Sequence, residues 1–101
     1  MTEYGAVFQK EAPEIDQAFG KFRDTIYAQS TLDAKTQQLI YIAIRASEGD
    51  GVAVGVHTGL AKKAGATWEE VRDTIMMTMI TSGMKGIMHC LKPASDSYNN
   101  T

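Results

Sequence analysis

The sequence predicts an all-α protein of about six helices. Apolar side chains recur at three- and four-residue intervals along most of the chain, and no segment shows the alternating pattern of a strand. Glycines at positions 49, 65 and 83 follow three of the periodic segments, and glycine commonly ends a helix. Because 101 residues have room for one hydrophobic core, we expect a single domain over residues 1–101.

The first two helices are predicted from apolar periodicity and from a proline. Residues 1–12 are expected to form a short leading helix around Val7 and Phe8. Pro13 suits the first turn of the next helix, where its missing N–H has no helical partner in any case. Apolar residues share one face of that helix, at Ile15, Ala18, Phe19, Phe22 and Ile26. The second segment is therefore an amphipathic helix.

Three further helices are predicted because each follows a residue that can cap it. The expected helices are 34–47 after Asp33, 52–64 after Asp50 and 68–82 after Thr67. Thr67 lies three residues before Glu70, which is the spacing of a capping box. Apolar residues cover nearly every face of 34–47 and 68–82. We therefore expect the three helices to form the centre of the fold.

A last helix is predicted from Met84 to Leu91, because its apolar residues fall on one face. Pro93 is expected to end this helix, since proline cannot donate the backbone hydrogen bond that a helix interior requires. The polar segment 95–101 is expected to be frayed.

Composition and charge argue against several classes of protein. The net charge is −2 and the basic residues are scattered, so we expect no nucleic-acid partner. We find no cationic leader before an apolar segment, and no apolar run approaches the ~20 residues that span a bilayer. We therefore expect no membrane association and a cytoplasmic location. The two nearly all-apolar helices carry more apolar surface than a small chain can cover, which predicts self-association.

Cysteine and histidine usage predicts neither a disulfide nor a metal site. The single cysteine, Cys90, fits a reducing compartment and is expected to be a small buried side chain. His89 is expected to face solvent, because the apolar residues beside it claim the buried side of the helix. His57, His89 and Cys90 do not have a recognised ligand spacing, so we expect no metal and no cofactor.

Two stretches resemble the carboxymuconolactone decarboxylase and alkylhydroperoxidase D family. Residues 32–40, LDAKTQQLI, look like the start of the family's central helix. Residues 57–71, HTGLAKKAGATWEEV, resemble its most recognisable segment, in which a histidine is followed by small residues, Ala-Gly-Ala-Thr and a pair of glutamates. The resemblance covers roughly 12–92. It implies an alkylhydroperoxidase D-like helical bundle that assembles as a trimer or a hexamer, with a pocket near a subunit boundary.

The chemical motif of the alkylhydroperoxidase D branch is not retained. That branch has a glutamate, a Cys-x-x-Cys pair and a histidine. In this chain the glutamate position falls on Gln38, the two cysteine positions on Asp50 and Ala53, and the histidine position on His57. Peroxide reduction by this route needs a thiolate and a second, resolving thiol. The family's thiol peroxidase activity is therefore expected to be lost.

The resemblance leaves two functions open, and it leaves open whether the protein is an enzyme. The first is acid/base chemistry on a small organic acid or lactone, with His57 and Asp50 as catalytic residues. Gln38 and Arg45 would then bind the substrate, Arg45 by recognising an anion. The alternative is a non-catalytic oligomer that binds a small molecule or serves as a scaffold.

Each of these candidate residues also has a purely structural interpretation. His57 suits a core position with one satisfied nitrogen, and Asp50 suits a helix cap. Gln38 and Arg45 belong to the narrow polar line of helix 34–47, with Tyr41 and Glu48, and such a line is often only solvated. The decarboxylase branch carries acidic and basic residues just before the histidine, whereas residues 51–56 are apolar or glycine here.

Overall fold

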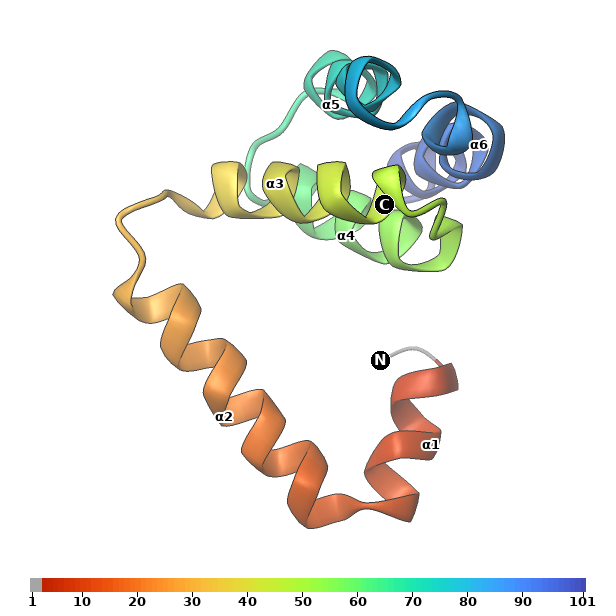
Figure 1. The fold of residues 1–101 in the computed structure, drawn as a ribbon. Helices are drawn as coiled ribbons and strands as arrows, with labels where there is room; N and C mark the ends of the chain where they lie inside the picture. Colours follow the sequence, from red (N-terminus) through yellow and green to blue (C-terminus); the bar gives the residue numbers. More distant parts are fainter. Residues whose placement is uncertain (1–2) are drawn as a thin grey trace. The chain divides into compact units, whose positions relative to one another are not determined.

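The computed structural model describes residues 3–101, and these form six α-helices and no strand (Figure 1). The helices are α1 (Glu3–Glu11), α2 (Pro13–Gln29), α3 (Ala34–Ser47), α4 (Gly51–Lys63), α5 (Trp68–Ser82) and α6 (Lys85–Asn99). The predicted fold class is confirmed. Residues 1 and 2 of the expected leading helix lie outside the described residues.

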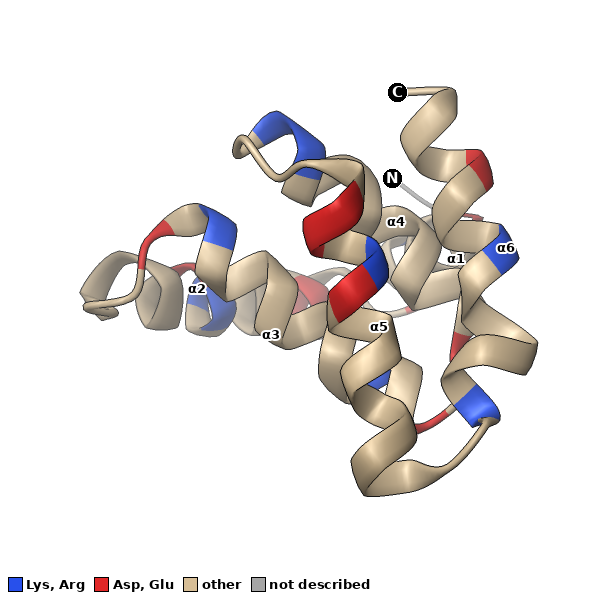
Figure 2. Ribbon diagram, turned by 90° about the horizontal axis from the view of Figure 1, so that it is seen from above, with Lys and Arg blue, Asp and Glu red and all other residues tan. Residues whose placement is uncertain are grey.

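The chain divides into two compact units, Met1–Thr31 and Leu32–Thr101. In the first unit α1 contacts α2, and in the second unit α3 to α6 pack on one another. The single domain over residues 1–101 stays a prediction. Acidic and basic residues are interspersed on the helices (Figure 2). Within residues 3–101 no helix combines the length and the apolar character that crossing a bilayer requires.

The hydrophobic core lies in the second unit and draws on all four of its helices. Its buried members are Ile42, Ala46, Val54, Ala61, Ala66, Val71, Ile75, Cys90 and Ala94. Two of them, Cys90 and Ala94, come from α6, and α6 packs closely on α4. The sequence placed the last helix outside the central three, whereas the structure makes it part of the core.

The predicted caps are present. The side chains of Asp33 and Asp50 each accept a hydrogen bond from the backbone N–H three residues further on, at 2.8 and 3.0 Å. Thr67 and Glu70 form the capping box, with distances of 3.1 and 2.9 Å between side-chain oxygen and backbone nitrogen. These bonds satisfy N–H groups that a helix start otherwise leaves without partners. The starts of α3, α4 and α5 could therefore be predicted from local sequence.

The predicted end of the last helix was wrong. Helix α6 continues through Pro93 to Asn99. Two tertiary hydrogen bonds hold its final turns: Ser97 Oγ donates to Gly55 O at 2.6 Å, and Tyr98 Oη donates to Ala66 O at 2.8 Å. Lys62 Nζ also donates to Tyr98 O, at 2.8 Å. Packing against α4 and the loop after it therefore outweighs the local cost of a proline in a helix.

The carbonyl oxygen four residues before Pro93 lies against α4. Because proline has no N–H, His89 O lacks the donor that residue 93 would supply. This oxygen approaches Gly51 so closely that a Cβ at position 51 would overlap it. Gly51 is therefore required by close backbone approach between α4 and α6.

Candidate functional site

Four polar side chains from α3 and α4 form a connected cluster, which we call the His57 cluster: Gln38, Tyr41, Arg45 and His57. The first three are spaced three and four residues apart, so they lie along one face of α3. His57 belongs to the neighbouring helix α4, which packs against α3.

His57 is held on one edge and on one face. Its Nδ1 lies 2.7 Å from Gln38 Oε1, and its ring is stacked on the ring of Tyr41, with 3.5 Å between centroids and an angle of 17° between planes. With Gln38 Oε1 as the acceptor, Nδ1 carries the proton, and Nε2 is then the basic nitrogen of the neutral ring. The half-buried imidazole is therefore held in one orientation by Gln38 and Tyr41.

Arg45 adds a cation at the other end of the cluster. Its Nε donates to Tyr41 Oη at 3.4 Å, and this hydrogen bond is the main cause that raises the pKa of Arg45. Its Nη1 lies 3.4 Å from Glu48 Oε1 and 3.8 Å from Asp50 Oδ2. The Arg45 side chain is 42% exposed, and ion pairs as exposed as this contribute about 0–1 kcal/mol. A bound anion can therefore compete with the two carboxylates for the guanidinium.

The structure brings two of the four predicted site residues, Gln38 and His57, into direct contact and links the other two to them through Tyr41. Gln38 contacts His57, and Arg45 joins through Tyr41. Asp50 caps α4 and faces Arg45, so it is linked to His57 through Arg45 and Tyr41. Tyr41 was given no role from the sequence, although its spacing to Gln38 and Arg45 on the same helix face was a usable signal.

An exposed apolar stripe lies on α4 beside the cluster. It consists of Val52, Val56 and Leu60, at four-residue intervals. Leu60 is three residues after His57 and therefore next to it on the helix surface. The candidate site thus combines an imidazole, a guanidinium and a neighbouring exposed apolar surface.

The only cysteine of the chain lies in the hydrophobic core. Cys90 is a free thiol buried in the core, as predicted. Burial raises its pKa, and the nearby carboxylate of Asp50 raises it further, so the thiol is favoured over the thiolate. His89 is exposed, as predicted. Within residues 3–101 no three His, Cys, Asp or Glu side chains are grouped so that they could hold a metal ion.

We expect Cys90 to resist a thiol reagent such as dithionitrobenzoate in the folded protein and to react readily in denaturant. The pKa of Cys90 is higher in the folded protein than in the unfolded chain, so keeping the thiol protonated contributes to the free energy of unfolding. This contribution is complete below about pH 9 and is lost as the pH rises through the pKa of the folded state. The free energy of unfolding should therefore fall more steeply above pH 9 in the wild type than in Cys90→Ala. Rapid labelling of the native protein would contradict this assignment.

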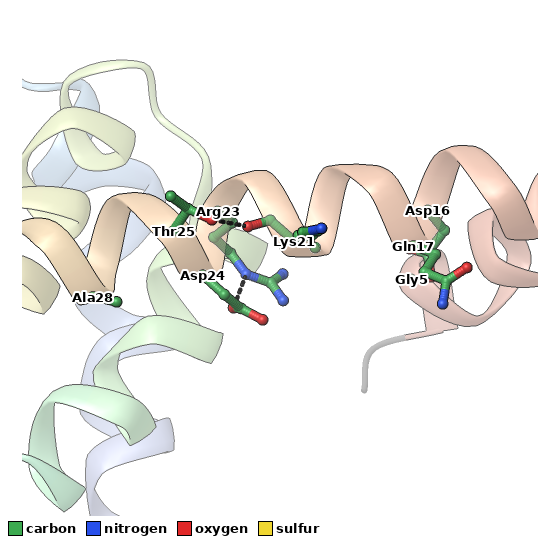
Figure 3. A pocket seen from close by; sticks show the side chains of 9 residues that line it. Gly5, Asp16, Gln17, Lys21, Arg23, Asp24, Thr25 and Ala28 are labelled. Atoms are coloured by element: carbon green, nitrogen blue, oxygen red, sulfur yellow. Dashed lines mark hydrogen bonds and ion pairs between the residues drawn. The ribbon is translucent and has the colours of Figure 1, made fainter.

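A hollow in the first unit is lined by Gly5 of α1 and by the polar side of α2 (Figure 3). Among its lining residues, Arg23 Nε pairs with Asp24 Oδ1 at 3.4 Å, and Thr25 Oγ1 donates to Lys21 O at 2.8 Å. These groups bond to neighbours on their own helix and are exposed. This hollow is therefore a weaker candidate site than the His57 cluster.

The fold and the cluster together define an all-helical protein with a histidine site between two adjacent helices. Residues 13–96 match the carboxymuconolactone decarboxylase family, and the chain belongs to that family. Two relatives come from Methanocaldococcus jannaschii, the uncharacterized proteins MJ0742 and MJ1511. MJ0742 is 37% identical over 85% of this chain and 84% of its own length. MJ1511 is 32% identical over 89% of this chain and 88% of its own length.

A solved structure has the same fold. It is a crystal structure of a protein from Burkholderia xenovorans LB400 that is provisionally named carboxymuconolactone decarboxylase. The TM-score is 0.87, the alignment covers 99% of this chain and 78% of that chain, and the sequence identity is 22%. At this identity the likeness establishes the fold, and chemistry has to be argued from the residues of the site.

Proposed function

We propose that the His57 cluster binds a small organic acid or lactone and that His57 acts on it as a general acid/base. The observation that carries this proposal is the contact of His57 with Gln38 and Tyr41, in a cluster that also contains Arg45. A proton carrier and a cation that are linked through Tyr41 suit a substrate with a carboxylate and an ionisable carbon or oxygen.

The proposed roles follow from the contacts. Gln38 sets the tautomer of His57 by accepting from Nδ1, and Nε2 takes or returns the substrate proton. Arg45 binds the carboxylate through the N–H groups that Tyr41 does not use. Asp50, predicted as a second catalytic residue, supports this arrangement by capping α4 and pairing with Arg45.

We also propose that thiol peroxidase activity by the family route is lost. Asp50 and Ala53 stand where the redox cysteines would be, and the carboxylate of Asp50 is used as a helix cap. Cys90 is buried, and its pKa is raised. A non-catalytic binding or scaffold role is the alternative, and the existing pairing of Arg45 with Glu48 and Asp50 favours it.

The test is a screen of small carboxylates and lactones, followed by binding calorimetry and product chromatography with two variants. We expect His57→Ala to lower turnover about 10²- to 10⁴-fold, because that is the usual contribution of a general acid/base. His89→Ala is the matched control, since His89 is exposed, and it should stay within about twofold of the wild type. Unchanged turnover and binding in His57→Ala would overturn the proposal. Binding without turnover in the wild type would favour the alternative.

Self-association is a further part of the proposal. We propose that copies of the chain assemble, as a trimer or a hexamer, through the apolar face of α2. Its residues Ile15, Phe19, Phe22 and Ile26 are 54–65% exposed, and no described residue of α1 or α2 is buried. A cytoplasmic location is supported by the unpaired Cys90.

A further inference from the structure

Tyr41 contacts both the imidazole of His57 and the guanidinium of Arg45. Its ring is stacked on His57, with 3.5 Å between centroids. Its hydroxyl oxygen lies 3.4 Å from Arg45 Nε, and the guanidinium carbon of Arg45 lies 5.5 Å from its ring centroid. Tyr41 therefore stands between the proton carrier and the cation, and it is half-buried in that position.

The donor and acceptor roles at the Tyr41 hydroxyl follow from the chemistry of its partner Arg45. Arginine has five N–H donors and no acceptor, so the phenol oxygen is the acceptor in the bond from Arg45 Nε. The phenol hydrogen is then a donor, as are the Nη hydrogens of Arg45. A carboxylate has acceptors only, so both side chains can donate to the same carboxylate.

We propose that Tyr41 positions His57 through its ring and binds the ligand's carboxylate through its hydroxyl, together with Arg45. The ring covers one face of the imidazole while Gln38 holds Nδ1, so the plane of the imidazole is fixed. The phenol places a donor beside the guanidinium. The binding role rests on the proposed function, whereas the positioning role can be tested without any ligand.

The positioning role is tested by proton NMR of the two histidines in the wild type, Tyr41→Phe and Tyr41→Leu. A ring stacked at this distance shifts the imidazole protons of His57 upfield. We expect that shift in the wild type and in Tyr41→Phe, and its loss in Tyr41→Leu. Exposed His89 is the internal reference in all three proteins. His57 signals that stay unshifted in the folded wild type would overturn the positioning role, even if Tyr41→Leu failed to fold.

The binding role is tested by calorimetric titration with succinate as the probe. Tyr41→Phe keeps the ring and removes only the hydroxyl, so it should bind succinate about tenfold more weakly, the loss expected for a hydrogen bond to a charged group. Equal affinity in the wild type and in Tyr41→Phe would overturn the binding role. If the wild type does not bind succinate but shows the upfield shift, the binding role fails and the positioning role is supported, whereas the proposed substrate class is decided separately by the screen of carboxylates and lactones.

Discussion

Replacing Gly51 by alanine is expected to destabilise the protein by about 3 kcal/mol, at the upper end of the usual cost of overpacking. The new Cβ would overlap His89 O and lie 3.2 Å from Pro93 Cγ. His89 O is a backbone atom inside α6, so it cannot rotate away as the end of a side chain would. The helices α4 and α6 would have to separate, and α6 contributes Cys90 and Ala94 to the core.

Gly55→Ala is the matched control, one helical turn further along α4. Its Cβ would meet Pro93 O at 3.8 Å and Pro93 Cβ at 3.9 Å, which are ordinary contact distances. Alanine is favoured over glycine inside a helix by up to about 1 kcal/mol, so this variant should be neutral or more stable. Urea denaturation gives both free energies of unfolding. Equal effects of the two substitutions would contradict the close approach of α6 at Gly51.

Replacing Phe22 by lysine is expected to convert the proposed oligomer into monomers. Seven large apolar side chains of α1 and α2 are exposed: Tyr4, Val7, Phe8, Ile15, Phe19, Phe22 and Ile26. An aromatic side chain alone can bury about 150–250 Å², so exposed residues of this size can supply a large part of the ~800 Å² that one partner of a standard interface buries. A lysine in the middle of such a face would place an unpaired charge in the interface.

The control for this experiment is Gln17→Lys, which adds the same charge on the opposite side of α2. Light scattering across a range of concentrations should give three or six chain masses for the wild type and for Gln17→Lys. Phe22→Lys should give one chain mass. A wild type that is monomeric at every concentration would refute association through α2.

Most of the helices could be predicted from local sequence. Asp33, Asp50 and Thr67 predicted the starts of three helices, because capping depends only on groups within one turn. The end of α6 was not predictable in this way. It depends on bonds from Ser97 and Tyr98 to α4 and to the loop after it, and partners so distant in sequence leave no local signal.

The arrangement of the candidate site residues was predicted in part. The resemblance located His57 and Gln38, and the polar line of α3 located Arg45. The resemblance did not show that His57 contacts Gln38, since this depends on how closely α3 and α4 pack. The stacking of Tyr41 on His57 could not be predicted for the same reason, because the two residues lie 16 positions apart on different helices. The role of Asp50 as a cap was visible locally, whereas its approach to Arg45 to 3.8 Å was not.

Because His89 O lies four residues before Pro93 and approaches Gly51, the effects of substitutions at positions 51 and 93 depend on each other. An alanine at 93 would supply the missing N–H and remove the ring that pushes against the carbonyl four residues earlier, so this oxygen could turn back toward its own helix. Position 51 would then tolerate a side chain that it otherwise rejects. Substitutions at the two positions are therefore expected to be non-additive, and in descendants of this chain a larger residue at 51 should arise together with the loss of the proline.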